Sequence, residues 1–143
     1  MQTVLFPYDD SAPAQRALQY LVDLSKRYQG LTVHVLNVQA DPKLYGRYGA
    51  LADVLKQLKE NATAHAKTFT DKAVAELEAA GIKAVGHPAI GEVLDEVQRV
   101  IKETGCDTVV MGTRGMGGLG NLLLGSMAIQ VLHGVSIPVL LIK

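Results

Sequence analysis

The sequence lacks several features that would assign it to common classes of protein. Its 143 residues include one cysteine, Cys106, so no disulfide within the chain can hold the fold together. Lys and Arg together number 14 and Asp and Glu together number 14, so no excess of positive charge draws the chain to nucleic acid or to an acidic membrane. No apolar run approaches the length of a bilayer span, and no basic residues precede the short apolar run near the N-terminus. We therefore expect a soluble cytoplasmic protein with no nucleic-acid or membrane partner.

Two patterns of catalytic and metal-binding proteins are also missing. There is no Gly-Lys-Ser or Gly-Lys-Thr, so no lysine is built in beside terminal phosphates as in P-loop enzymes, and nothing marks a base that activates water. The four histidines, His34, His65, His87 and His133, show no metal-ligand spacing. We expect packed or capping histidines, no metal site and no catalytic residue.

Short apolar runs alternate with amphipathic segments along the chain. Strands are predicted at 4–6, 32–38, 83–88, 108–111 and 138–142, and helices after Ser11, from Leu51 to Gly81, from Glu92 to Gly105, and from Ser126 to Gly134. This alternation is typical of a parallel sheet with crossover helices. Right-handed crossovers predict an α/β fold, a single doubly wound, Rossmann-like domain over 1–143, with a five-stranded sheet in the order 3-2-1-4-5 and helices on both faces.

A glycine-rich stretch follows the fourth predicted strand. It places Gly112, Gly115, Gly125 and Ser126 in the spacing Gly-x2-Gly-x9-Gly-Ser. The glycines let backbone N–H groups approach an anion, and Ser126 can cap a helix and donate to the same anion. Asp9 follows the first strand, which neighbours the fourth in the predicted sheet, so both segments reach one rim of the sheet. A nucleotide site is indicated there, although a glycine-rich loop can also be a plain connection between a strand and a helix.

Three segments resemble the universal stress protein family, in its ATP-binding branch. They are 6–11 (Phe-Pro-Tyr-Asp-Asp-Ser), 110–119 (Val-Met-Gly-Thr-Arg-Gly-Met-Gly-Gly-Leu) and 124–128 (Leu-Gly-Ser-Met-Ala). The glycine spacing marks that branch and is kept in full. The usual first-strand signature, Pro-x-Asp-Gly-Ser, is matched at Pro7, Asp9 and Ser11, whereas Asp10 replaces the glycine. This second carboxylate could weaken phosphate binding or help to hold a divalent ion.

The resemblance implies a set of nucleotide-binding residues: Pro7, Asp9, Val38, Met111, Gly112, Arg114, Gly115, Gly125, Ser126 and Met127. Asp9 and the backbone of Val38 would hold the adenosine end. Gly125, Ser126 and Met127 would hold the phosphates. Asp9 can instead brace the first helix, and Arg114 can instead face solvent or a second subunit.

The same resemblance implies a function. It points to an ATP-binding protein, with Mg²⁺, that acts as a nucleotide-dependent sensor or switch in the stress response, with slow or no hydrolysis. We do not expect an enzyme, although weak ATP hydrolysis stays open. Two alternatives remain at this stage: a ligand-free dimeric interaction module, and a slow ATPase or nucleotide-transferring enzyme.

The last predicted strand bears on assembly. Val139 to Ile142 is apolar without alternation, and the predicted strand order puts it at an edge of the sheet. An exposed apolar edge favours pairing with another chain unless something covers it. We therefore predict a homodimer through this strand, and the family resemblance points the same way.

Overall fold

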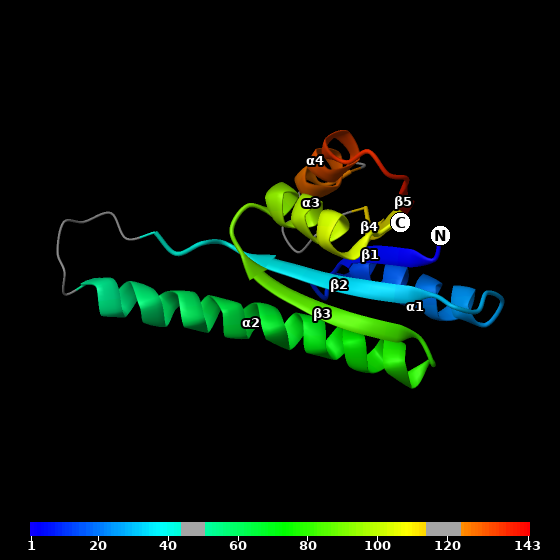
Figure 1. Cartoon of the computed structure of the whole chain (residues 1–143), viewed down its shortest axis with the longest axis horizontal. Coiled ribbons are helices and arrows are strands. Elements are labelled where there is room, and N and C mark those ends of the chain that lie inside the picture. The colour runs from blue at the N-terminus through cyan, green and yellow to red at the C-terminus, as the bar shows by residue number, and fades with distance from the viewer. Residues whose placement is uncertain (44–50, 114–123) are drawn as a thin grey trace.

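A parallel sheet lies between two layers of helices in the computed structural model, which describes residues 1–43, 51–113 and 124–143 (Figure 1). The elements in chain order are β1 (Thr3–Pro7), α1 (Ala12–Ser25), β2 (Thr32–Gln39), α2 (Leu51–Ala79), β3 (Lys83–Ile90), α3 (Val93–Thr104), β4 (Thr108–Gly112), α4 (Ser126–Gly134) and β5 (Val139–Ile142). Each predicted strand and helix is present.

The five strands form one sheet in the order β3-β2-β1-β4-β5, and every pairing is parallel. This confirms the predicted α/β fold and strand order. Leu5 of β1 lies opposite His34 of β2 on one side and Val109 of β4 on the other. Strand β1 is therefore central, and the carboxyl ends of β1, β2 and β4 meet at one rim of the sheet.

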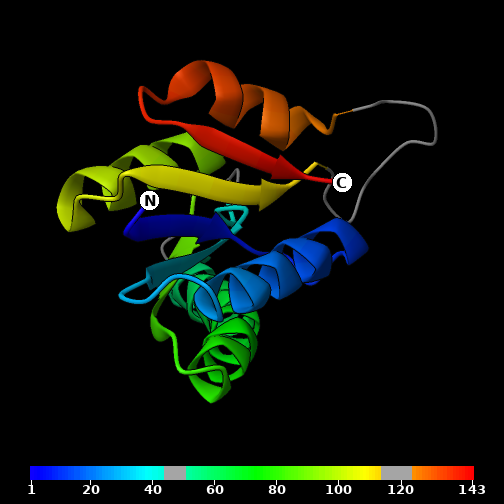
Figure 2. The ribbon, with the colours of Figure 1, turned by 90° about the vertical axis from the view of Figure 1, so that its right-hand side faces the viewer.

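Helices cover both faces of the sheet, α1 and α2 on one and α3 and α4 on the other (Figure 2). Alternate side chains of β1 enter the two cores, since Val4 and Phe6 pack on the side of α1 and α2 whereas Leu5 packs on the side of α3 and α4. All three are fully buried. Strands that are buried on both faces lack a polar side, which is why these runs are apolar without alternation.

The ends of two helices follow from local sequence. Ser11 is the N-cap of α1, where its hydroxyl accepts from Ala14 N at 3.3 Å, and Pro13 lies in the first turn, where it loses no hydrogen bond. Helix α3 ends at Gly105, whose φ of +68° is the left-handed conformation that glycine adopts without steric cost. Ser11 thus sets where the chain enters α1 from β1, and Gly105 sets where it leaves α3 for β4.

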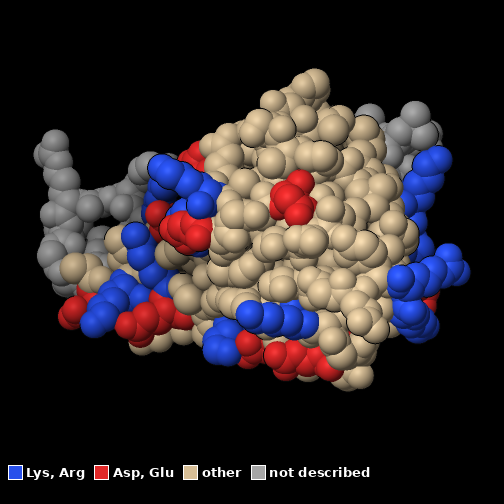
Figure 3. Space-filling model, turned by 45° about the vertical axis from the view of Figure 1, so that its right-hand side comes forward, with Lys and Arg blue, Asp and Glu red and all other residues tan. Residues whose placement is uncertain are grey.

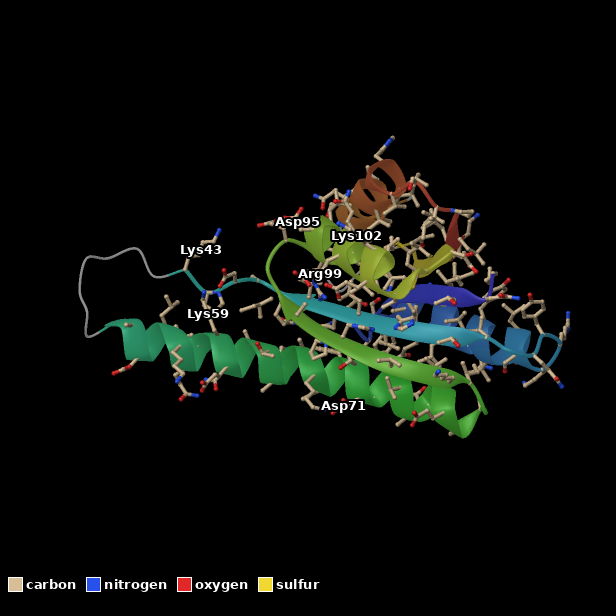
Figure 4. All side chains as sticks on the ribbon, viewed as in Figure 1. Lys43, Lys59, Asp71, Asp95, Arg99 and Lys102 are labelled. Carbon is tan, nitrogen blue, oxygen red and sulfur yellow. The ribbon has the colours of Figure 1, made fainter. Side chains whose placement is uncertain are left out.

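Helix α2 is longer than the sheet it covers. It has 29 residues, and its N-terminal part extends beyond the strands (Figure 1). Ala66, Ala73 and Leu77 are fully buried, whereas Val54 and Leu58 are 49% and 38% exposed. Lys59 of this projecting part points to the segment after β2, with its Nζ 3.4 Å from Asp41 Oδ1 (Figure 4). Only the C-terminal part of α2 therefore packs on the sheet.

Two further observations concern the cysteine and the helices. Cys106 is 4% exposed, and its burial raises the pKa of the thiol. Of the helices within the described ranges, none combines the length and the apolar character needed to cross a bilayer.

Candidate functional site

A cavity of about 350 Å³ lies at the carboxyl ends of β1 and β2. It draws its walls from the turn after β1, the end of β2, and helices α2, α3 and α4. The lining residues are Pro7, Tyr8, Asp9, Leu36, Asn37, Val38, Gln39, His65, Phe69, Val93 and Met127. Its size is within the range of about 300–1,000 Å³ that is usual for small-molecule sites. Doubly wound sheets bind their ligands at this rim.

A second hollow is larger, about 680 Å³, but less suited to a small ligand. Its described lining residues all belong to the projecting part of α2, between Ala52 and Lys67. No strand end is among these described residues. The cavity at the strand ends is the better candidate because several elements converge on it with both polar and apolar groups.

Asp9 both lines the cavity and braces the first turn of α1. Its Oδ1 accepts a hydrogen bond from Ser11 N at 3.1 Å, which is the local bond that an aspartate in a turn commonly makes. The two roles considered for Asp9 from the sequence are therefore compatible, since bracing the turn holds the side chain at the cavity.

Asp10, at the position of the signature glycine, adopts a φ of +62°. This is the left-handed region, which glycine enters freely and aspartate enters more readily than most residues. Its carboxylate accepts from Lys72 Nζ at 2.7 and 2.8 Å and from the Tyr8 hydroxyl at 2.7 Å. Lys72 first and then Tyr8 lower the pKa of Asp10 to about 2. The carboxylate is thus ionised and its charge is balanced by a lysine of α2, so it does not face the cavity as an unpaired negative group.

Two rings of α2 form one wall of the cavity. The rings of His65 and Phe69 lie 5.0 Å apart between centroids, with 79° between their planes. The sequence predicted a packed or capping role for His65. Helical periodicity assigns both residues to one face of α2, but it does not reveal that this face passes the ends of β1 and β2.

The start of α4 is held beside the end of β4. Gly125 N donates to Thr113 O at 2.8 Å, and Thr113 N donates to Ile142 O at 2.9 Å. Gly125 is the N-cap of α4, so the prediction that Ser126 caps this helix is wrong: Ser126 is its first residue. None of the described side chains caps the helix, which leaves first-turn N–H groups available to an anion. Met127, in that turn, reaches the cavity wall.

The other predicted residues lie in different surroundings. Met111 is 1% exposed and packs in the core on the side of α3 and α4. At Gly112, an added Cβ would lie 2.7 Å from Pro13 C and 2.8 Å from Ala14 N, so this glycine permits the close packing of α1 on the end of β4. Arg114 and Gly115 lie outside the described residues.

The structure thus brings part of the predicted set together. Pro7, Asp9, Val38 and Met127 line one cavity, and Gly125 and Ser126 precede Met127 at the start of α4. The sequence did not indicate Tyr8, Asn37, Gln39, His65, Phe69 and Val93 as lining residues.

Comparison with known proteins identifies the family. Universal stress protein MJ0577 of Methanocaldococcus jannaschii is 27% identical over 151 residues, which cover 98% of this chain and 93% of that protein. Its solved structure matches with a TM-score of 0.82 at 27% identity, covering 99% of this chain and 95% of that one.

Two more distant structures share the fold. An Arabidopsis thaliana protein of the universal stress protein family, solved with AMP bound, is 16% identical with a TM-score of 0.67 and covers 100% of this chain and 92% of its own. A universal stress protein in complex with cAMP is 22% identical with a TM-score of 0.69, covering 99% of this chain and 97% of its own. The model of the universal stress protein family matches residues 1–143, and the chain therefore belongs to that family.

Proposed function

We propose that this protein binds an adenine nucleotide in the cavity at the ends of β1 and β2, with ATP and Mg²⁺ as the leading ligand. It acts as a nucleotide-dependent sensor or switch in the stress response, and hydrolyses the nucleotide slowly or not at all. The observation that carries the proposal is that one cavity joins the carboxyl ends of two central strands to the first turn of α4.

The adenosine end lies at β1, β2 and α2. The rings of His65 and Phe69 offer a wall on which a flat base can pack, since aromatic faces stack on bases. Val38 offers its backbone to the base edge, and the carboxylate of Asp9 suits the hydroxyls of a ribose.

The phosphate end lies at α4. The start of a helix carries about half a positive charge and several free N–H groups. Gly125, Ser126 and Met127 bring these groups to the phosphates, while Met111, Gly112, Arg114 and Gly115 complete the set that the family motif implies. Mg²⁺ would be held mainly by the phosphates, because the carboxylate of Asp10 is paired with Lys72.

The ligands of relatives favour the same chemistry. One member of the family has been solved with AMP bound and another in complex with cAMP. Both ligands carry adenine, a ribose and one phosphate, which fit an apolar base pocket next to a helix start.

The test begins with the nucleotide that the purified protein carries. Denaturation followed by mass analysis identifies a bound nucleotide, and the stripped protein is then titrated with ATP, ADP and AMP, with and without Mg²⁺. We expect affinity near the micromolar range, about 8 kcal/mol of binding free energy. A phosphate-release assay on the same sample measures hydrolysis.

Gly125→Val is the decisive variant. The backbone of Gly125, at φ −73° and ψ 158°, is an extended conformation that valine adopts without strain, so the substitution changes mainly access to the first turn of α4. We expect ATP affinity to fall at least tenfold, whereas Gln130→Ala, on the exposed side of the same helix, leaves it unchanged. Unchanged binding in Gly125→Val, or no nucleotide and no titration signal in the parent protein, contradicts the proposal.

We also propose that the protein is a homodimer through β5. This strand ends the sheet, and no Lys, Arg, Asp or Glu occurs between Arg114 and Lys143. Ile129 and Leu132 of the adjacent α4 are 43% and 44% exposed, and Figure 3 shows a broad face with few charged side chains in its middle. Sedimentation at micromolar concentration tests the proposal, and a monomer there contradicts it.

A further inference from the structure

The side chains of Asn37 and Gln39 form a hydrogen-bonded relay that starts at the backbone of Tyr8. Asn37 Nδ2 donates to Tyr8 O at 2.8 Å, and Gln39 Nε2 donates to Asn37 Oδ1 at 2.7 Å. All three residues line the cavity at the ends of β1 and β2. From this relay we propose that Gln39 selects the base of the nucleotide, by offering its side-chain oxygen to a base that carries an exocyclic amino group. The proposal rests on the nucleotide binding proposed above.

The relay can run in one direction only. A backbone carbonyl oxygen accepts hydrogen bonds and cannot donate them, so Asn37 must turn its NH₂ group to Tyr8 O. Its Oδ1 then faces Gln39 and needs a donor, which fixes the NH₂ group of Gln39 on that side. The amide of Asn37 is 5% exposed, so turning it over would bury two acceptors against each other.

The backbone of Gln39 is held as firmly as its side chain. It is the last residue of β2, opposite Ile90 of β3, and its carbonyl accepts from Gly91 N at 2.9 Å. Within the described part of the chain, no side chain or backbone group donates to Gln39 Oε1. This oxygen is therefore the acceptor that the relay leaves for a ligand.

An oriented amide of this kind discriminates between bases. Adenine presents an amino donor beside a ring-nitrogen acceptor, and an amide pairs with both, whereas guanine and hypoxanthine present a carbonyl oxygen where adenine has the amino group. An oxygen facing an oxygen leaves two acceptors unpaired, and the relay opposes the turn of Gln39 that would relieve this. Gln39 is thus a specificity-determining residue, and Asn37 is a positioning residue that acts through it.

The test compares ATP with inosine triphosphate, which carries a carbonyl oxygen in place of the 6-amino group. Because both nucleotides have the same sugar and triphosphate, the ratio of their dissociation constants isolates the base. We expect the parent protein to bind ATP about tenfold more tightly than inosine triphosphate, the upper end of what one hydrogen bond contributes. Gln39→Leu should bring the ratio close to one, and Gln57→Leu on the projecting part of α2 should leave it unchanged.

Two more variants separate a specific role from a structural one. Gln39→Glu loses the donor to Asn37 Oδ1, but both of its oxygens accept, so it should keep the preference for ATP even if the lost bond and the charge weaken the binding of both nucleotides. Asn37→Leu breaks the relay and should lower the ratio while ATP still binds.

Each contrary result has its own meaning. If the parent protein binds both nucleotides equally, or if Gln39→Leu keeps the preference while Gly125→Val abolishes binding, the role of Gln39 is overturned and the proposed function stands. If the parent protein binds neither nucleotide, the proposed function is overturned as well.

Discussion

Lys72 and Asp10 join the C-terminal part of α2 to the turn after β1, with Lys72 Nζ 2.7 Å from Asp10 Oδ1 and 2.8 Å from Oδ2. The two residues are 62 positions apart. Tyr8, which also donates to Asp10, lines the cavity, and α2 supplies the opposite wall through His65 and Phe69. The ion pair therefore helps to set the distance between two walls of the candidate site.

Breaking this pair should affect binding more than stability. Lys72 is partly exposed, and exposed ion pairs contribute little to folding. We expect Lys72→Met to lower the urea midpoint only slightly but to weaken ATP binding a few-fold, because α2 is less well held at the cavity. Lys67→Met removes the pair with Asp71 on the same helix and serves as the control. Equal ATP affinity in the two variants would rule out this role of Lys72.

The same pair predicts how stability depends on acid. The pKa of Asp10 falls from 3.8 to about 2 in the folded protein, because of Lys72 and then Tyr8. Well above pH 3.8 Asp10 is ionised in both states and the stabilisation is complete. Between pH 3.8 and about 2 the unfolded chain takes up the proton first, so the free energy of unfolding falls. We expect Asp10→Asn, which tolerates the same φ, to flatten this part of the stability profile measured by urea unfolding. A profile parallel to that of the parent protein would contradict the assignment.

A pair of histidines predicts that stability also depends on pH in a less acidic range. His34 Nδ1 and His87 Nε2 lie 2.9 Å apart on neighbouring strands. Burial lowers the pKa of both, and the charges of Lys83 near His34 and of Arg99 near His87 act the same way, whereas Glu103 opposes them at His87. The folded protein resists protonation that the unfolded chain accepts, so the free energy of unfolding should fall as the pH drops below 6.5.

The variant for this pair is His87→Gln, which keeps a hydrogen-bonding side chain and cannot titrate. We expect it to reduce the slope of stability against pH between about 6.5 and 5. The control is His133→Gln, at an exposed position of α4. If both variants keep the full slope, the histidine pair is not its source.

The close packing of α1 on Gly112 predicts that a larger residue at this position destabilises the fold. An added methyl group would meet the backbone of Pro13 and Ala14, which cannot move aside without shifting the first turn of α1. We expect Gly112→Ala to destabilise the fold by about 1–3 kcal/mol in denaturant unfolding. At Gly134 the methyl group would meet only the end of the Leu94 side chain, which can rotate away, so Gly134→Ala should cost less. The reverse order would contradict this account.

The sequence was sufficient for the fold because its signals are local and agree with one another. The apolar runs set the strands, and the cap at Ser11 and the glycine at Gly105 set helix ends. The strand order then followed from the handedness of the crossovers. The start of α4 at Ser126 was predicted correctly, but Ser126 was offered as a possible cap, whereas Gly125 is the N-cap and its N donates to Thr113 O, a tertiary bond that the sequence does not show.

The site was predicted less completely, because much of it depends on pairs that are distant in sequence. Lys72 reaches Asp10 from α2, and Asn37 reaches the backbone of Tyr8, although neither spacing is a motif. Gln39 carries no signal in the sequence, since its orientation depends on its bond to Asn37, which is itself bonded to the backbone of Tyr8 just after β1. The glycine spacing indicated the end of the candidate site at α4, whereas the wall formed by α2 became apparent only in the structure.

The projecting part of α2 offers a place where a change in the cavity could be measured. The first of its described residues to be buried is Ala66, which follows directly on His65 of the cavity wall, while the part toward Leu51 has no contact with the sheet core. That part is about 22 Å long at 1.5 Å per residue. A tilt of about 5° at Ala66 would move the tip of this part by roughly 2 Å. If a ligand in the cavity tilts the helix, we expect a distance probe at Ala52 to register the change.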